Sequence, residues 1–521
     1  MSLFLPTPST RRAGASVALL AAGALALSGC AASSQSATPS TAVVAAYSGT
    51  VDSLDPQHSD YGQTNLIDAT LYEPLVTYDA DNQLVAGLAS TFELSADATS
   101  VSIVLNDGVT FHDGSPLTSA DVKYSLDRYV SVGTGIASLL SNYASTEIVD
   151  DTTLTITLKQ PDSIFLGKLS KAYILSQKLV EANAGDDQGQ GWLSTHDAGT
   201  GPFTLPDDVV AGQNITVERY DDYWDYDEAR PESITFRRID ESATQRAELE
   251  AGNIDYANNL STADFNAIDA ADITKASLDI VNQQFIYFNT TTGPTSDVRV
   301  RQALQLAFDY EGALSSILGG QGQIATGPVP LGMPCTLDTP AFAQDLDKAK
   351  QLLDDAGQSG LTLTMRYQPD ISDQAQEAVL YQSDLQKIGV TLNLEPITFA
   401  DYLTLLQSTD TIPQMILLAD NAQVPNVGSF LTQFYGPDSA GSNRSGFTSP
   451  ELSALITDAA ATSDEAAQCD DYTQAQQIVY DQATAVDLFT IPWPAAYSSR
   501  LQNVEASATV TPVSFADVTV D

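Results

Sequence analysis

The sequence predicts an α/β protein of more than one domain, and three features of the chain support this prediction. The first is its length, because 521 residues exceed what one hydrophobic core usually organises. The second is a strand, a helix and a strand between Leu361 and Leu394, which is typical of a βαβ unit in a parallel sheet. The third is a group of segments between Phe92 and Leu158 in which every second residue is apolar, as in an antiparallel sheet.

The composition limits the classes of partner. Apolar residues make up 43% of the chain, which is typical of a globular protein. The formal net charge is −45, from 22 basic and 67 acidic residues. Such a charge repels nucleic acid phosphates and anionic lipid head groups, so neither is an expected partner of the folded body.

The N-terminus predicts where the protein works. Arg11 and Arg12 precede an apolar run over residues 13–27, and Leu27-Ser28-Gly29-Cys30 follows directly. This pattern resembles a bacterial lipoprotein signal, which implies that residues 1–29 are removed and that Cys30 carries the lipid. The apolar run is shorter than the roughly 20 residues of a membrane-spanning helix. Residues 30–41 are small and polar, as in a flexible tether.

The folded body begins with a predicted strand over Val43–Tyr47 and a helix over Asn65–Tyr72 that ends before Pro74. The central stretch has a buried strand at Phe285–Phe288, a turn, and a helix for which Asp297 is the expected N-cap. Arg299 and Arg301 on this helix could form an anion clamp, but solvated or structurally paired side chains are the preferred interpretation.

The second half continues as alternating strands and helices. Asp345 or Asp347 caps a helix that ends before Gly357, and a helix over 375–387 follows the strand at Leu361. A later apolar strand ends at Ala419-Asp420-Asn421. The carboxyl ends of parallel strands commonly carry ligand-contacting groups, so this point is a candidate site.

Several segments, in the same order along the chain, resemble those of the extracellular solute-binding proteins of ABC importers, family 5, the oligopeptide, dipeptide and nickel-binding class. The matching segments are Val51–Pro56, Tyr72–Val76, 108–126, Gly199–Phe203, Asn289–Leu304, 443–450 and Asp487–Pro494. The resemblance covers nearly all of the chain after Cys30. It implies a type II periplasmic-binding-protein fold with two α/β lobes joined by a hinge, the larger carrying an extra antiparallel subdomain.

The resemblance also implies domain limits. Residues 42–284 form lobe I, with the extra subdomain at about 78–200, and residues 285–490 form lobe II. Residues 491–521 return to lobe I. The two lobes are expected to be joined near Phe288 and Phe489.

The ligand-binding candidates follow from the same resemblance. In peptide-binding members the position of Asp420 carries an aspartate that pairs with the ligand's α-ammonium group, and Asn421, Tyr61, Trp493 and Tyr497 are further cleft candidates. Alternatives remain open, since Asp420 could simply begin a turn with Asn421, and Trp493 and Tyr497 could be core aromatics.

Neither a catalytic site nor a metal site is predicted, and no cofactor is expected. The histidines at positions 58, 112 and 196 lack metal-ligand spacing, and His112 beside Asp113 has no nucleophile motif near it. Gly199–Phe203 is not a phosphate loop, because Pro202 lacks an N–H and no lysine follows. Cys335 and Cys469 could be bridged or free.

The expected function is capture of a peptide or similar small solute and its delivery to an ABC permease and ATPase complex. The protein would be a monomer, lipid-anchored on the outer face of the cell membrane. A nickel chelate or a sugar is the alternative ligand. A receptor or chaperone lipoprotein is another class, and a secreted hydrolase is the least favoured.

Overall fold

The computed structural model describes residues 41–521 except 59, 81, 207–208, 210–213, 259, 406–410, 438, 440 and 507–512. The predicted signal peptide, Cys30 and the tether up to residue 40 therefore lie outside the described residues. None of the helices in the described part of the chain combines the length and apolar character needed to cross a lipid bilayer.

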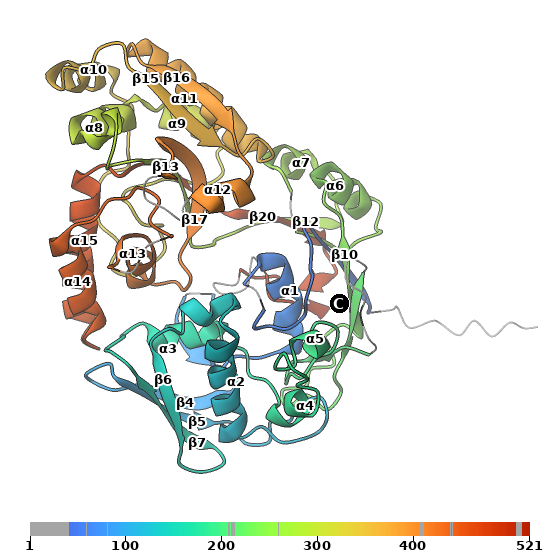
Figure 1. Cartoon of the computed structure of the whole chain (residues 1–521). Coiled ribbons are helices and arrows are strands. Elements are labelled where there is room, and N and C mark those ends of the chain that lie inside the picture. The colour runs from blue at the N-terminus through green and yellow to red at the C-terminus, as the bar shows by residue number, and fades with distance from the viewer. Residues whose placement is uncertain are drawn as a thin grey trace, which may run out of the picture. The chain divides into compact units, whose positions relative to one another are not determined.

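Lobe I is built on a seven-stranded mixed sheet in the order β12-β20-β11-β1-β10-β9-β8 (Figure 1). Its strands are β1 Val43–Tyr47, β8 Phe203–Thr204, β9 Ile215–Arg219, β10 Ser233–Arg238, β11 Tyr256–Ala257, β12 Ile273–Leu278 and β20 Trp493–Ser498. Its helices are α1 Gly62–Leu71, α4 Gln177–Ala182, α5 Gln190–Leu193, α6 Ser242–Glu250 and α7 Thr262–Ala267, and β21 Leu501–Gln502 pairs with β22 Thr519–Val520. The predicted strand at Val43–Tyr47 is confirmed, and it pairs in parallel with β10.

The extra subdomain is an antiparallel sheet in the order β4-β5-β7-β6, with α2 packed against it (Figure 1). Its elements are β2 Val76–Tyr78, β3 Leu84–Ala86, β4 Ala89–Leu94, β5 Ser100–Leu105, α2 Ser119–Val132, η1 Gly135–Ser138, β6 Tyr143–Ile148, β7 Thr153–Leu158, α3 Phe165–Lys168 and η2 Leu169–Lys171. Its core runs from Leu75 to Ile174, whereas Leu175, Val180 and Leu193 pack into lobe I. The subdomain therefore ends near residue 174, not near residue 200 as the sequence suggested.

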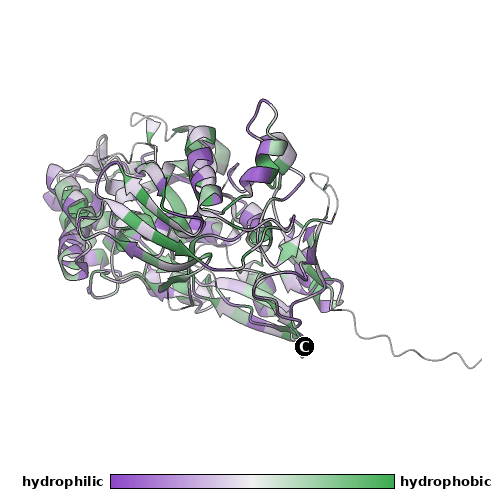
Figure 2. Ribbon diagram, turned by 90° about the horizontal axis from the view of Figure 1, so that it is seen from below, coloured by the Kyte–Doolittle hydropathy of each residue, from purple (hydrophilic) through white to green (hydrophobic). Residues whose placement is uncertain are grey.

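Lobe II is built on a five-stranded sheet in the order β16-β15-β17-β13-β18. The strands of this sheet are β13 Asn282–Phe288, β15 Thr362–Tyr367, β16 Thr391–Pro396, β17 Met415–Asn421 and β18 Ala485–Asp487. A separate two-stranded sheet pairs β14 Gln323–Ile324 with β19 Phe489–Thr490. The helices of lobe II are η3 Pro294–Ser296, α8 Val298–Ala307, α9 Tyr310–Ser316, α10 Leu346–Asp355, α11 Ser372–Lys387, α12 Phe399–Leu405, α13 Val427–Tyr435, α14 Pro450–Ala460 and α15 Glu465–Asp481. Figure 2 shows that the helices carry both hydrophobic and hydrophilic residues, as surface helices covering a core do.

The βαβ unit and the helix caps predicted for lobe II are confirmed. β15 and β16 pair in parallel with α11 between them in the chain, so the predicted βαβ unit is confirmed. Asp297 caps α8 by accepting the Arg299 N–H, and Asp345 caps α10. Both faces of β13 are buried, because Ile286 and Phe288 pack into one core while Phe285 and Tyr287 pack into another.

The two arginines of α8 have structural partners. Arg299 pairs with Asp297, and Arg301 is buried with its guanidinium donating to the carbonyl oxygens of Thr295, Gln482 and Ala483. The anion-clamp interpretation is therefore not supported.

The chain crosses between the lobes twice, at residues 279–281 between β12 and β13 and at residues 491–492 between β19 and β20. The first crossing lies before Asn282, so β13 begins three residues earlier than the predicted boundary at 285. Phe288 is at the far end of β13 and does not lie at the crossing. The ends of lobe II are close together, since the Ile491 N–H donates to Asn282 Oδ1 at 3.3 Å.

α1 carries the buried polar side chains of Thr64 and Asp68 one turn apart, and the buried Tyr72 follows at its C-cap. Neither carboxyl oxygen of Asp68 has a hydrogen-bond partner among the described residues. Burial raises the pKa of Asp68 well above its usual value, and the nearby Asp55 raises it further. The folded protein therefore holds a proton that the unfolded chain releases above about pH 4.

Asp68→Asn is expected to stabilise the protein increasingly as pH rises. Because its pKa is raised in the folded state, the protonated Asp68 contributes fully to stability below about pH 4. As pH rises toward the folded pKa, the free energy of unfolding falls by up to about 1.4 kcal/mol per pH unit. The asparagine has no such dependence. Denaturant unfolding at pH 5 and pH 8 measures the difference, with the exposed Asp222→Asn as control. An equal effect of Asp68→Asn at both pH values would contradict the prediction.

Candidate functional site

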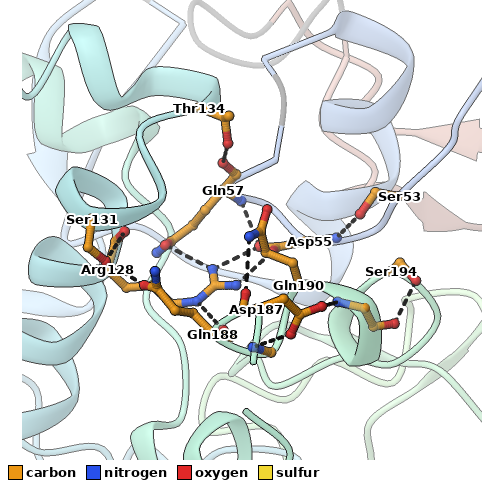
Figure 3. Close-up of polar contacts among 12 residues, drawn as sticks. Ser53, Asp55, Gln57, Arg128, Ser131, Thr134, Asp187, Gln188, Gln190 and Ser194 are labelled. Carbon is orange, nitrogen blue, oxygen red and sulfur yellow. Dashed lines mark hydrogen bonds and ion pairs between the residues drawn. The ribbon is translucent and has the colours of Figure 1, made fainter. Parts of the chain in front are cut away.

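The first part of the site is a loop of lobe I that is fixed by a buried ion pair. Asp55, in the segment Val51–Pro56, receives two hydrogen bonds from the Arg128 guanidinium on α2, from Nη1 at 3.0 Å and Nη2 at 2.7 Å. Both side chains are almost completely buried. Figure 3 shows the guanidinium between Asp55 and the backbone of Gln188, whose carbonyl accepts from Arg128 Nε at 2.9 Å. A bidentate pair of this kind holds both chain segments in one orientation.

Gln57 extends the same network. Its Oε1 accepts from Arg128 Nη1 at 3.0 Å, its Nε2 donates to the Ser125 carbonyl, and its own carbonyl accepts from Thr134 Oγ1 (Figure 3). The segment after Pro56 is therefore anchored to α2 at several points. It leads directly to Asp60, Tyr61 and the start of α1.

Asp60 takes part in a contact that joins the two lobes. Lys171 Nζ, from η2 of the subdomain, lies 2.8 Å from Asp60 Oδ2 and 3.4 Å from Gln423 Oε1, just after β17 of lobe II. Asp60 Oδ1 accepts from Asn65 Nδ2 at 2.8 Å. The side chains of Lys171 and Asp60 are only 10% and 21% exposed, so water screens this pair less than a surface pair. We call Asp60, Lys171 and Gln423 the seam triad.

Asp420 lies on β17 and faces the interior of lobe II. Its two oxygens accept from Arg444 Nε at 3.2 Å and Nη2 at 3.0 Å, and both side chains are buried. The Arg444 guanidinium also lies over the rings of Phe434 and Tyr402. Asp420 is thus neutralised within lobe II, and its role toward a ligand ammonium stays a prediction.

The other candidates occupy different surroundings. Tyr61 is 58% exposed, and Asn421 is exposed at the end of β17, where it is paired with Asn282. Trp493 and Tyr497 lie on β20 and pack against the lobe I core, with Trp493 Nε1 donating to the Asn258 carbonyl at 2.9 Å. Tyr61 and Asn421 are therefore close in sequence to Asp60 and Gln423 of the seam triad. Trp493 and Tyr497 are partly buried against the core of lobe I.

Further hydrogen bonds join lobe II to the rest of the chain. The Ser163 N–H donates to the Ala460 carbonyl at 2.9 Å, and Ser163 Oγ donates to the Ala459 carbonyl at 3.2 Å. Thr262 Oγ1 on α7 donates to Asp373 on α11 at 2.6 Å. The subdomain and lobe I therefore each contact lobe II directly.

Cys335 and Cys469 form a disulfide bond within lobe II, with their Cα atoms 5.0 Å apart. His112 contacts the Asp197 carboxylate, which raises its pKa although burial acts in the opposite direction, and its Nε2 lies 2.9 Å from the Gly201 carbonyl. Within the described ranges, no group of three or more histidine, cysteine or acidic side chains is placed to hold a metal ion.

Sequence reasoning missed Asp60, Lys171, Gln423 and Arg444. Asp60 and Gln423 are within three residues of predicted positions, so the loops were found but not their contact residues. Arg444 lies in the family-like segment 443–450, but that resemblance gave it no role, and Lys171 lies in none of the matching segments. Their roles follow from partners that are distant in the chain.

The two lobes, the double crossing and the contacts between lobes define a hinged binding protein. A family model for the bacterial extracellular solute-binding proteins, family 5 (middle region), matches residues 83–442. The chain belongs to this family.

Two comparisons show how similar the relatives are. The probable D,D-dipeptide-binding periplasmic protein DdpA of Escherichia coli K12 is 28% identical over 478 residues, which cover 89% of this chain and 92% of that protein. The glutathione-binding protein GsiB of Pectobacterium atrosepticum is 25% identical over 473 residues, covering 88% and 90%.

Solved structures agree on the fold. The ABC transporter substrate-binding protein CtaP from Listeria monocytogenes superposes with a TM-score of 0.82 at 21% identity, covering 92% of this chain and 99% of that one. DppA from Helicobacter pylori, in complex with the peptide STSA, gives a TM-score of 0.78 at 22% identity, covering 92% and 98%. The predicted type II periplasmic-binding-protein fold is confirmed.

Proposed function

We propose that this protein is the substrate-binding lipoprotein of an ABC importer and that its ligand is a short peptide. The observation that carries the proposal is the seam triad, in which charged and polar side chains from the subdomain, lobe I and lobe II meet at one place. A solute bound there contacts both lobes. It therefore favours the closed arrangement by its greater affinity for that arrangement.

Peptide is the preferred ligand class because relatives named for binding a dipeptide or glutathione align over nearly the whole chain. The seam triad contains a positive group, Lys171, and a negative group, Asp60, which suits a ligand with both charges, such as a peptide zwitterion. A structural neighbour from Campylobacter jejuni holds a nickel–histidine complex, so a metal chelate is the second candidate. Catalysis has no part in the proposal, and the captured solute passes unchanged to the permease and its ATPase.

A panel of solutes tests the ligand class. The panel contains D-Ala-D-Ala, L-Ala-L-Ala, glutathione, nickel–histidine and a neutral disaccharide, each added to protein purified without refolding. A peptide present at 100 times its Kd is expected to add about 2.7 kcal/mol to the free energy of unfolding, seen as a higher melting temperature. Stabilisation by nickel–histidine or the disaccharide alone would overturn the peptide proposal. Mass spectrometry of the recovered peptide distinguishes binding from hydrolysis.

The N-terminal pattern supports lipid anchoring through Cys30 after removal of residues 1–29, with the tether 30–41 leading to the folded body on the outer face of the membrane. Cys30→Ala is expected to move the protein from the membrane fraction to the soluble or secreted fraction. Membrane retention of this variant would contradict the anchor.

A further inference from the structure

We propose that the Lys171 ammonium binds the carboxylate of the captured solute and that Asp60 positions this ammonium. This inference rests on the proposed function, since it concerns the same seam between the lobes. It adds the chemical class of ligand group that the seam selects.

The geometry of Lys171 supports the assignment. An ammonium group has three donor hydrogens, and the structure gives Lys171 Nζ two acceptors among the described residues, Asp60 Oδ2 and Gln423 Oε1. One donor direction therefore remains for an anionic group. The side chain is only 10% exposed, so a charge-assisted hydrogen bond formed there is strong.

Asp60 fixes the position of that ammonium. Its carboxylate is itself held, because Oδ1 accepts from Asn65 on α1 while Oδ2 pairs with Lys171. The loop that carries Asp60 is anchored by the buried pair of Asp55 and Arg128. These contacts hold the Lys171 ammonium at a fixed place relative to lobe I.

The second basic group in this region has a different role. Arg444 donates two hydrogen bonds to Asp420, and both residues are buried inside lobe II. It is therefore committed to an internal partner. Gln423, by contrast, follows the same strand and reaches Lys171 across the seam, which makes the Lys171 environment dependent on the contact between lobes.

The test compares free and blocked peptides by isothermal titration calorimetry. The probes are D-Ala-D-Ala, L-Ala-L-Ala and glutathione, together with their C-terminal amides; for glutathione the glycine carboxylate is amidated. Wild-type protein is expected to prefer the free acid of a bound peptide over its amide by about 10- to 100-fold. Lys171→Gln is expected to weaken binding of the free acid by a similar factor and to leave the amide almost unchanged. Asp60→Asn is expected to give a smaller loss of the same preference.

Lys168→Gln is the matched control. Lys168 lies three residues earlier, its side chain is 12% exposed, and it pairs with Asp162 at 2.7 Å. This variant should keep the wild-type ratio of acid to amide affinity. If Lys171→Gln weakens acid and amide equally, Lys171 supports the lobe contact only and the carboxylate assignment is wrong.

The remaining outcomes separate this inference from the proposed function. If a peptide binds with no preference for its free acid, only the Lys171 assignment is overturned. If none of the three peptides binds in either form, the peptide proposal falls and the assignment falls with it.

Discussion

Arg128→Met is expected to lower the free energy of unfolding by about 3–5 kcal/mol, the usual cost of removing one partner from a buried ion pair. The substitution leaves Asp55 buried without its two guanidinium donors and also removes the bonds to Gln57 and Gln188. Urea unfolding without ligand measures the change.

Lys123→Met on the same helix is the control for this prediction. Lys123 pairs with Asp127 at 2.6 Å, but both side chains are well exposed, so the expected loss is no more than about 1 kcal/mol. The double variant Asp55→Leu with Arg128→Met should recover part of the loss, because it leaves no unpaired charge. If Arg128→Met and Lys123→Met lower the free energy of unfolding equally, the buried pair contributes no more to stability than the exposed pair, and the prediction is wrong.

Arg444→Met is the second substitution with a large expected effect, again about 3–5 kcal/mol of lost stability. It leaves the Asp420 carboxylate buried and unpaired, and it removes the guanidinium from the faces of Phe434 and Tyr402. Arg366→Met is the control within lobe II, because Arg366 and Glu395 form a more exposed pair at 3.5 Å. A loss below 1 kcal/mol for Arg444→Met would contradict the structural role.

Asp420→Asn separates the structural role of this pair from the predicted ligand role. Ligand-free stability should fall, because the arginine loses its counter-charge. If Asp420 also holds a ligand ammonium, the affinity for a free peptide should fall more than the affinity for its N-acetylated form. If both affinities are unchanged, Asp420 acts only as the partner of Arg444.

Local patterns in the sequence predicted much of the fold. A short apolar run predicted β1, and apolar alternation predicted β4, β5 and β7 of the subdomain. The cap at Asp297 follows from residue type alone, whereas residue type left Asp345 and Asp347 as alternatives for the cap of α10. The start of β13 was missed because Gln283 and Gln284 look like loop residues. They are buried in the sheet, and Gln283 Nε2 donates to the distant Gly327 carbonyl.

Tertiary contacts explain what the sequence did not predict. Leu175, Val180 and Leu193 have apolar character that fits either core, and only the fold shows that they belong to lobe I. The strand end and the family resemblance located Asp420, but its partner Arg444 lies 24 residues away on a different segment. Lys171 and Asp60 are 111 residues apart, and no periodicity connects them.

The close ends of lobe II have a topological consequence. Residues 282–490 form one uninterrupted stretch, and a hydrogen bond from the Ile491 N–H to Asn282 Oδ1 joins its two ends. This stretch contains the Cys335–Cys469 disulfide and the buried pair of Asp420 and Arg444. In topology it is a guest module inserted into a host. The N- and C-terminal ends of this stretch therefore lie close together, as in a domain inserted into a loop of another domain.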